Sequence, residues 1–200
     1  MDNYINSLCM QLGDLANGVP DALRIYKHGR YCFLNGDYSG SKKAEILNYL
    51  LHSSVIPSES DLADDVIFGY GGIGIVLHNK SVICRGVMIG SNVTVGGGGM
   101  RGAFWLDKNL NKCYAPNIKD YVNISTGAKV LGGIEIGEFS IIGANSVVRN
   151  SVPPLSVVAG VPSRIVNKIT IDNCLNYKSN FYTLRDISEE EFIDKIKNFS

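Results

Sequence analysis

The sequence predicts a mainly β protein built around a parallel β-helix, because aliphatic residues return at every sixth position in two stretches of the chain. These positions are Leu77, Ile83, Ile89 and Val95 in the first stretch and Ile118, Ile124, Val130, Ile136, Ile142 and Val148 in the second. Neither the 3.6-residue period of a helix nor the two-residue period of a strand gives this spacing. In a β-helix each six-residue unit forms one side of a triangular prism, with its aliphatic residue pointing inward.

Small residues and glycines favour the same fold. Two positions before an aliphatic residue of the second stretch, Val122, Ala128, Ser140 and Ser146 are small or β-branched, and Ile134 is larger. The chain also has 22 glycines in 200 residues, which fits many corner turns, since a positive φ costs glycine little. A glycine-rich β-sandwich is the alternative, and the strict six-residue period in two separate stretches argues against it.

The composition limits the partners and the compartment. The formal net charge is zero, because 19 Lys and Arg balance 19 Asp and Glu, so we expect no nucleic-acid partner. No apolar run approaches a membrane span, and Met1-Asp2-Asn3 does not begin a secretory signal, so we expect a cytoplasmic protein. The five cysteines form no CxxC pair, so neither a disulfide framework nor a zinc site is expected, and no metal.

The chain divides into three expected parts. Residues 1–55 lack the six-residue period and predict a helical N-terminal cap, which would shield the open end of the first coil. Residues 56–166 predict the β-helix, with a protruding loop at 100–117 where the repeat stops. Residues 167–200 predict a C-terminal tail that ends in a helix.

Helices are expected at four places in the two end segments. Helices are predicted after Pro20, which suits a first helical turn, and over residues 44–51. The last helix should begin at a capping box made by Ser188 and Glu191. A further helical face near the N-terminus is formed by Ile5, Leu8 and Leu12.

Four motifs resemble a known family. The segments GGIGIVLHNKSVI, NVTVGGGG, GAKVLGGIEIGEFSIIGANSVV and VPPLSVVAGVPSRIV resemble the hexapeptide-repeat acyltransferases, nearest to serine acetyltransferase and the polysaccharide O-acetyltransferases. The resemblance covers about residues 56–168. It implies a left-handed coil, against the usual right-handed crossover rule. It also implies a homotrimer with acetyl-CoA as co-substrate in the groove between neighbouring subunits.

Acyl transfer to a hydroxyl needs one general base with a pKa near neutrality, and histidine is the natural choice. His78 is the single histidine of the repeat region, so we expect it to be the catalytic residue; a structural role is the alternative. The sequence departs from its relatives here. Their histidine slot is Gly71 in the serine acetyltransferase pattern and Tyr70 in the polysaccharide pattern, and a second, loop histidine is replaced by Ala115.

Two aromatic residues are candidates for holding the acceptor substrate. Tyr70 lies in the displaced histidine slot but is too basic to replace a neutral-pH base. Trp105, the single tryptophan, lies in the protruding loop, and an exposed indole suits stacking against the C–H face of a sugar ring. The alternative is that Trp105 anchors the loop to its own or the next subunit.

The resemblance also implies residues that bind acetyl-CoA. Gly97 corresponds to the position where the backbone approaches the thioester. Thr126 and Ala144 occupy small-residue positions that line the pantetheine groove. Small residues at these offsets also occur in coils far from any ligand.

The end of the groove is implied by the AGVPSRIV motif. Ser163 and Arg164 correspond to the residues that close the groove. Arg164 and Lys168 are expected to meet the nucleotide phosphates through charge-assisted hydrogen bonds.

Three functions remain open at this point. The first is an acetyl-CoA-dependent O-acetyltransferase that acts directly, in a ternary complex, on a hydroxyl of a sugar or surface polysaccharide. The second is serine acetyltransferase, and the shortness of the helical region and the altered histidine motifs argue against it. The third is a catalytically silent trimeric scaffold or binding protein, which the loss of the usual histidine permits.

Overall fold

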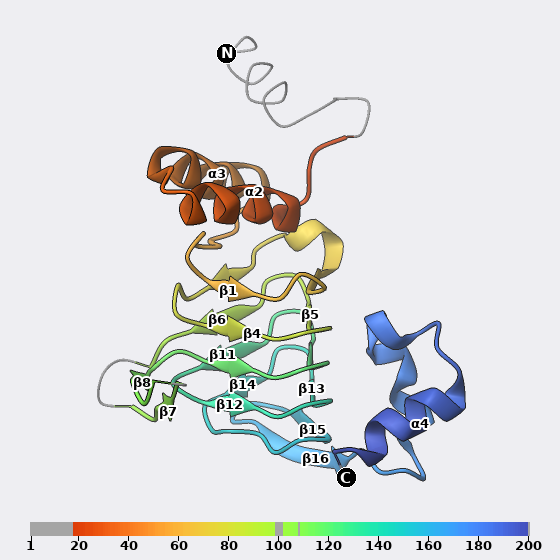
Figure 1. Ribbon diagram of the computed structural model, residues 1–200. Coiled ribbons are helices and arrows are strands. Elements are labelled where there is room, and N and C mark those ends of the chain that lie inside the picture. Colours follow the sequence, from red (N-terminus) through yellow and green to blue (C-terminus); the bar gives the residue numbers. More distant parts are fainter. Residues whose placement is uncertain (1–17, 99–101, 108, 200) are drawn as a thin grey trace.

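The computed structural model describes residues 18–98, 102–107 and 109–199. The chain forms a prism of short stacked strands, with two helices above its first coil and a helical tail along one side (Figure 1). The predicted helical face of Ile5, Leu8 and Leu12 lies outside the described residues. No helix among the described residues is long and apolar enough to cross a membrane.

Three sheets form the three faces of a left-handed parallel β-helix, so the predicted fold class is confirmed. Sheet 1 contains β1 (Asp61–Leu62), β4 (Val82–Ile83), β9 (Asn117–Ile118) and β12 (Glu135–Ile136). Sheet 2 contains β2 (Ile67–Phe68), β5 (Met88–Ile89), β10 (Asn123–Ile124), β13 (Ile141–Ile142), β15 (Ser156–Ala159) and the antiparallel β16 (Arg164–Lys168). Sheet 3 contains β3 (Val76–Leu77), β6 (Thr94–Gly96), β11 (Lys129–Leu131) and β14 (Val147–Val148).

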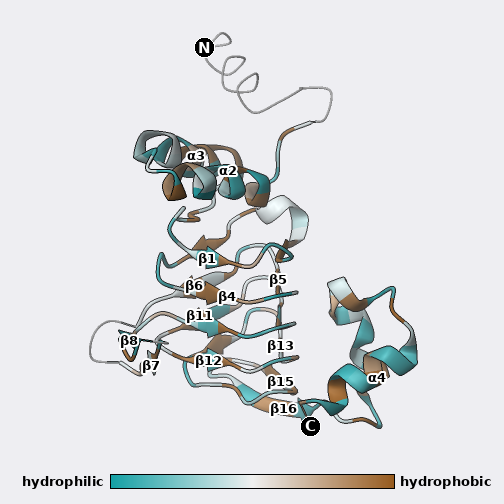
Figure 2. Ribbon diagram, viewed as in Figure 1, coloured by the Kyte–Doolittle hydropathy of each residue, from teal (hydrophilic) through white to brown (hydrophobic). Residues whose placement is uncertain are grey.

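The inward residues are those that the six-residue period predicts. Every aliphatic residue of the two predicted series is at most 2% exposed, and the small residues two positions earlier are equally buried. Each inward aliphatic side chain contributes roughly 1.5–3 kcal/mol relative to an exposed one. The outward residue is polar in some strands, such as Lys129 in β11 and Glu135 in β12, and apolar in others, such as Val82 in β4, so teal and brown both occur in the prism (Figure 2).

Turns between the sheets stack into three corners, which are named here by one residue each. The Gly74 corner, between sheets 2 and 3, contains residues 69–75, 90–93, 125–128 and 143–146. The His78 corner, between sheets 3 and 1, contains 78–81, the segment from 97 to 116, 132–134 and 149–151. The Tyr121 corner, between sheets 1 and 2, contains 63–66, 84–87, 119–122, 137–140 and 153–155.

The N-terminal helices are α2 (Ala22–Leu34) and α3 (Tyr38–His52). Pro20 precedes α2 rather than occupying its first turn, because the Asp21 side chain caps the helix by accepting from the Arg24 N–H at 2.7 Å. The helix expected at 44–51 begins earlier. Asp37 caps it by accepting from the Gly40 N–H at 2.8 Å.

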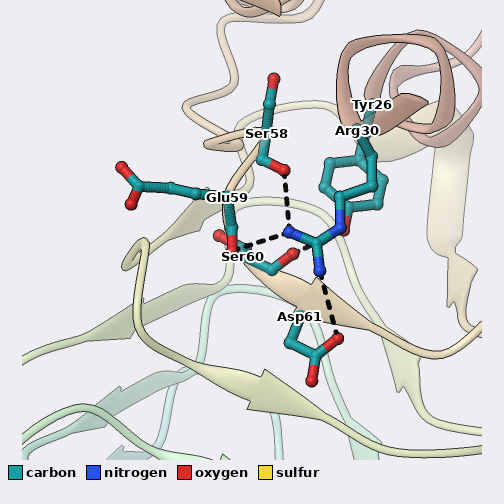
Figure 3. Close-up of polar contacts among 6 residues, drawn as sticks. All are labelled: Tyr26, Arg30, Ser58, Glu59, Ser60 and Asp61. Carbon is teal, nitrogen blue, oxygen red and sulfur yellow. Dashed lines mark hydrogen bonds and ion pairs between the residues drawn. The ribbon is translucent and has the colours of Figure 1, made fainter. Parts of the chain in front are cut away.

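Helix α2 is joined to the first coil by polar contacts (Figure 3). The Tyr26 hydroxyl donates to the Ser60 carbonyl at 2.7 Å, and Arg30 donates to the carbonyls of residues 58 and 59 at 3.3 and 3.0 Å. Arg30 also lies 3.6 Å from the Asp61 carboxylate. These donors satisfy backbone acceptors at the open end of the coil, where an unpaired edge invites association.

The C-terminal tail packs on sheet 2 and the Tyr121 corner. It contains two 3-10 segments, η3 (Cys174–Asn180) and η4 (Tyr182–Leu184), and helix α4 (Glu189–Lys197). Phe139 of the prism is fully buried beneath two rings of the tail. The centre of its ring lies 5.3 Å from that of Phe181 and 6.4 Å from that of Phe192. The Ser188 side chain caps α4 by accepting from the Glu191 N–H at 3.1 Å, which is one of the two contacts of the predicted capping box.

Two details of the expected layout differ. The predicted loop contains an antiparallel hairpin, β7 (Trp105–Leu106) with β8 (Lys112–Cys113), and it ends one residue early because Asn117 already belongs to β9. At the other end, the chain turns back after β15 as β16, so sheet 2 extends to Lys168. A further short 3-10 turn, η2 (Gly69–Gly72), connects β2 to β3.

Candidate functional site

The Gly74 corner carries a narrow exposed strip of small side chains. Outside η2, its left-handed backbone positions alternate between glycine and asparagine, namely Gly74, Asn92, Gly127 and Asn145. The Asn92 side chain fills the space above Gly74, and the Asn145 side chain fills the space above Gly127, so each of these glycines lacks room for a side chain of its own. The exposed Thr126 and Ala144 lie between these positions. The sequence-predicted pantetheine residues therefore share one continuous edge.

Tyr70 lies at the upper end of the same edge, in η2. Its side chain is 79% exposed, and its backbone has a φ of 53°, which is unfavourable for a bulky residue. The neighbouring Gly71 also has a positive φ, of 71°. The structure therefore aligns Tyr70, Thr126 and Ala144 on one corner.

The predicted phosphate-binding residues are separated. β16 runs antiparallel to β15, with Arg164 opposite Ala159 near the Gly74 corner and Lys168 opposite Ser156 at the other end. Four residues of extended chain span about 13 Å at 3.3 Å each. The Ser163 N–H donates to the Val147 carbonyl at 3.2 Å, so Ser163 and Arg164 stay beside the Gly74 corner.

Lys168 instead takes part in a contact at the Tyr121 corner. Its ammonium donates to the Ser156 hydroxyl at 2.9 Å. Arg164 and Lys168, which the resemblance places against the nucleotide phosphates, therefore lie at opposite ends of β16.

His78 and Gly97 meet at the His78 corner. The Lys80 backbone N–H donates to Nδ1 of His78 at 3.1 Å. The opposite side of the ring faces Gly97: a Cβ at Gly97 would lie 2.9 Å from both Cδ2 and Nε2 of His78. A side chain at position 97 would therefore collide with the imidazole, and glycine leaves room for the ring to lie against the backbone.

The hairpin of the protruding loop stands on this corner. The Trp105 indole N–H donates to the Ala115 carbonyl at 2.7 Å, so the indole is anchored within its own loop. Phe104 is the more exposed aromatic residue, at 44%. The Lys112 ammonium lies 4.5 Å from the centre of its ring, which is a cation–π contact, and the Tyr114 ring lies 6.0 Å away.

Sheet 3 separates the two groups of predicted residues. His78, Gly97 and Trp105 lie on one of its edges, and Tyr70, Thr126 and Ala144 lie on the other. Between them, Lys129 of β11 donates from its ammonium to the Asn92 carbonyl at 2.7 Å. Lys129 is not among the residues that the sequence suggested, because its outward position in a strand gives no signal until the coils are stacked.

Two partly exposed cysteines of the prism, Cys113 in the loop hairpin and Cys84 in the Tyr121 corner, have thiols with raised pKa values. Burial raises the pKa of the Cys113 thiol, and the nearby Asp107 raises it further. Burial and Asp120 likewise raise the pKa of Cys84. Since the thiolate is the reactive form, a covalent acyl-cysteine intermediate is disfavoured. Among the described residues no group of three His, Cys, Asp or Glu side chains is arranged to hold a metal ion.

The chain is similar to serine acetyltransferases in sequence. It is 34% identical to that of Escherichia coli strain K12 over 152 residues, which is 74% of this chain and 50% of the relative. It is 38% identical to that of Haemophilus influenzae over 125 residues, which is 60% of this chain and 43% of the relative. The chain therefore spans about half the length of the curated relatives that it matches. No family model matches the chain.

Solved structures show the same likeness. A serine acetyltransferase of Brucella abortus in complex with coenzyme A has a TM-score of 0.66 and 28% identity, covering 74% of this chain and 56% of that one. A serine acetyltransferase in complex with cysteine has a TM-score of 0.63 and 32% identity, covering 73% and 56%.

These matches indicate the hexapeptide-repeat acyltransferase family. The relatives and structures described are all serine acetyltransferases, and the polysaccharide O-acetyltransferase branch of the expected resemblance gains no support from them.

Proposed function

We propose that the protein is an O-acetyltransferase that uses acetyl-CoA and transfers the acetyl group directly to a hydroxyl in a ternary complex. The observation that carries this proposal is the likeness of about three quarters of the chain to serine acetyltransferases, one of which is described in complex with coenzyme A. Burial raises the pKa of Cys113, the cysteine of the loop hairpin, and this agrees with direct transfer rather than an acyl-cysteine intermediate.

L-Serine is the acceptor that the comparisons favour, because the relatives are named for it. A saccharide hydroxyl, which the loop aromatic residues first suggested, is the second candidate. The observation in its favour is Phe104, an aromatic residue that is 44% exposed on the loop beside the His78 corner.

Acetyl-CoA is proposed to lie along the Gly74 corner. Thr126 and Ala144 leave the edge low enough for an extended pantetheine chain, and larger side chains there would block it. Ser163 and Arg164 lie at the end of this strip and would meet the phosphates, while Lys168 is held at another corner. Gly97 is proposed to lie against the thioester of a bound acetyl-CoA.

A homotrimer is proposed because one chain does not bring the two corners together. Within a chain, sheet 3 separates His78 and Gly97 from Thr126 and Ala144. If the His78 corner of one copy faces the Gly74 corner of the next, a threefold ring gives every copy one complete site. Light scattering should return the mass of three chains, and a monomer at working concentration would argue against this arrangement.

The test of the function is thiol release from acetyl-CoA in the presence of L-serine, nucleotide sugars and oligosaccharides. Release with L-serine and not with the saccharides would support serine acetyltransferase, and the reverse result would restore the saccharide acceptor. Acetyl-CoA binding without transfer to any acceptor would favour the scaffold alternative. Absence of binding would contradict the proposal altogether.

A further inference from the structure

The backbone holds the His78 ring in one orientation. The His78 carbonyl accepts from the Ser81 N–H at 2.9 Å, from the Ser81 hydroxyl at 2.6 Å and from the Ser60 hydroxyl at 3.3 Å. Its ring nitrogen Nδ1 accepts from the Lys80 N–H at 3.1 Å. Because both ends of the residue are bonded to the turn, the imidazole is fixed relative to the prism.

This orientation selects one tautomer of the neutral ring. A neutral imidazole has one nitrogen that accepts and one that donates. Since Nδ1 accepts from the Lys80 N–H, the proton belongs on Nε2. Nε2 lies on the side of the ring that faces Gly97, and no hydrogen bond joins it to any residue in the described part of the chain. His78 thus presents an N–H donor at the point where the loop leaves the prism.

A general base at this point would need the other tautomer. To take a proton on Nε2, the neutral ring must carry its hydrogen on Nδ1. There it would point at the Lys80 N–H, and the hydrogen bond between Lys80 and His78 would be lost. The local backbone therefore opposes the role that the sequence suggested for His78.

We propose that His78 is a catalytic residue as a neutral hydrogen-bond donor, with Nε2–H directed at the acetyl carbonyl oxygen of acetyl-CoA beside Gly97. This inference rests on the proposed acetyl transfer. The acceptor oxygen forms a bond to the carbonyl carbon, and the electron pair of the C=O bond moves onto the carbonyl oxygen, where the fixed N–H stabilises it. The electron pair on the oxygen then re-forms the C=O bond as the C–S bond breaks, the thiolate leaves with the C–S electron pair, and the hydroxyl proton passes through water to that sulfur.

Two substitutions separate the two ring nitrogens. His78→Asn keeps an oxygen that can accept from the Lys80 N–H, as in an Asx turn, but has no group near the position of Nε2. His78→Gln places an amide N–H near the position of Nε2 and lacks the turn acceptor. His78→Ala removes both groups.

The readout is the infrared stretch of the carbonyl in bound acetyl-CoA labelled with ¹³C at that carbon. Wild-type protein and His78→Gln should lower the frequency relative to free acetyl-CoA, and His78→Asn and His78→Ala should not. The rate of transfer should fall roughly 10²–10³-fold in His78→Asn, as for loss of one oxyanion donor, and less in His78→Gln. An unchanged frequency shift in His78→Asn would overturn the donor role, and so would equal loss in His78→Gln and His78→Asn.

A second measurement does not depend on substitution or on an acceptor. The ¹⁵N shifts of the His78 ring in the wild-type protein should show a protonated Nε2 and an unprotonated Nδ1. A majority Nδ1–H tautomer would overturn the inference. Bound acetyl-CoA without a carbonyl shift would overturn the inference alone, whereas wild-type protein that does not bind acetyl-CoA would overturn the proposed function as well.

Discussion

The Gly74 corner and the Tyr121 corner solve the same backbone problem with different residues. Both need one left-handed residue in successive coils. Outside η2, the Gly74 corner uses Gly74, Asn92, Gly127 and Asn145, whereas the Tyr121 corner uses Gly86, Tyr121, Phe139 and Leu155. Glycine and asparagine adopt this conformation at little cost, but tyrosine, phenylalanine and leucine do so with strain.

The difference shows which corner is structural. The large side chains of the Tyr121 corner are covered by the C-terminal tail, and the Phe139 ring lies 4.8 Å from that of Tyr121 and 5.3 Å from that of Phe181. Burial of these rings offsets the backbone strain. Outside η2, no segment among the described residues packs over the Gly74 corner. Its small side chains leave room for an extended ligand. One corner therefore stabilises the fold, and the other is available for binding.

The largest effect is expected from Phe139→Ala, which removes the centre of the tail contact. The substitution should lower the free energy of unfolding by about 3–5 kcal/mol, the usual cost of deleting a buried aromatic ring. Denaturant unfolding followed by circular dichroism measures this loss. A loss below about 1 kcal/mol would show that the covered corner does not carry the stability assigned to it.

Ala144→Trp tests the open corner. A bulky indole on the strip should weaken acetyl-CoA binding at least tenfold, which is about 1.4 kcal/mol, with little change in unfolding. Titration calorimetry measures the affinity. Asp65→Trp, an exposed position at the Tyr121 corner, is the matched control and should bind as wild type does. Equal affinity in the two variants would remove the strip as the binding surface.

Arg164→Ala and Lys168→Ala compare two cations of one strand that end at different corners. Loss of an exposed charge-assisted hydrogen bond to phosphate should weaken acetyl-CoA binding by roughly 1 kcal/mol in Arg164→Ala. Lys168→Ala should leave the affinity nearly unchanged, since that ammonium is bonded to Ser156. The same calorimetric titration measures the acetyl-CoA affinity of both variants. A larger loss of affinity in Lys168→Ala than in Arg164→Ala would mean that Lys168, and not Arg164, binds the phosphates.

Tyr26→Phe tests the cover at the open end of the prism and should give the smallest effect. Loss of the hydroxyl that donates to Ser60 should cost about 1 kcal/mol of unfolding free energy at neutral pH. Burial raises the pKa of Tyr26 above its usual value. The folded state thus favours the neutral phenol, so this contribution is complete below the unfolded pKa of about 10 and is lost as the pH rises through the folded pKa.

Denaturant unfolding at neutral and alkaline pH checks both parts of this prediction. The stability of Tyr26→Phe should fall less steeply above about pH 10 than that of the wild-type protein. Parallel curves for the two proteins would mean that the Tyr26 phenol is not coupled to folding.

The sequence by itself determined the prism and its inward residues. Burial follows the chain at a fixed interval, so the series from Ile118 to Val148 identified the core positions without any knowledge of the turns. The sequence also predicted that Ser188 caps α4, because Ser188 and Glu191 are only three residues apart at the start of one helix. Both signals are local in the chain.

Only the tertiary structure decided which polar residues meet. Arg164 and Lys168 lie at opposite ends of the extended β16, and the antiparallel pairing of β16 with β15 places these ends at different corners. The packing of Phe139 under Phe181, and the position of Gly97 against His78, depend on coils and segments that are distant in sequence. A periodic pattern fixes how far a residue lies along the prism axis and whether it points inward. Which corners face one another, and which are covered, depends on long-range packing that no local spacing encodes.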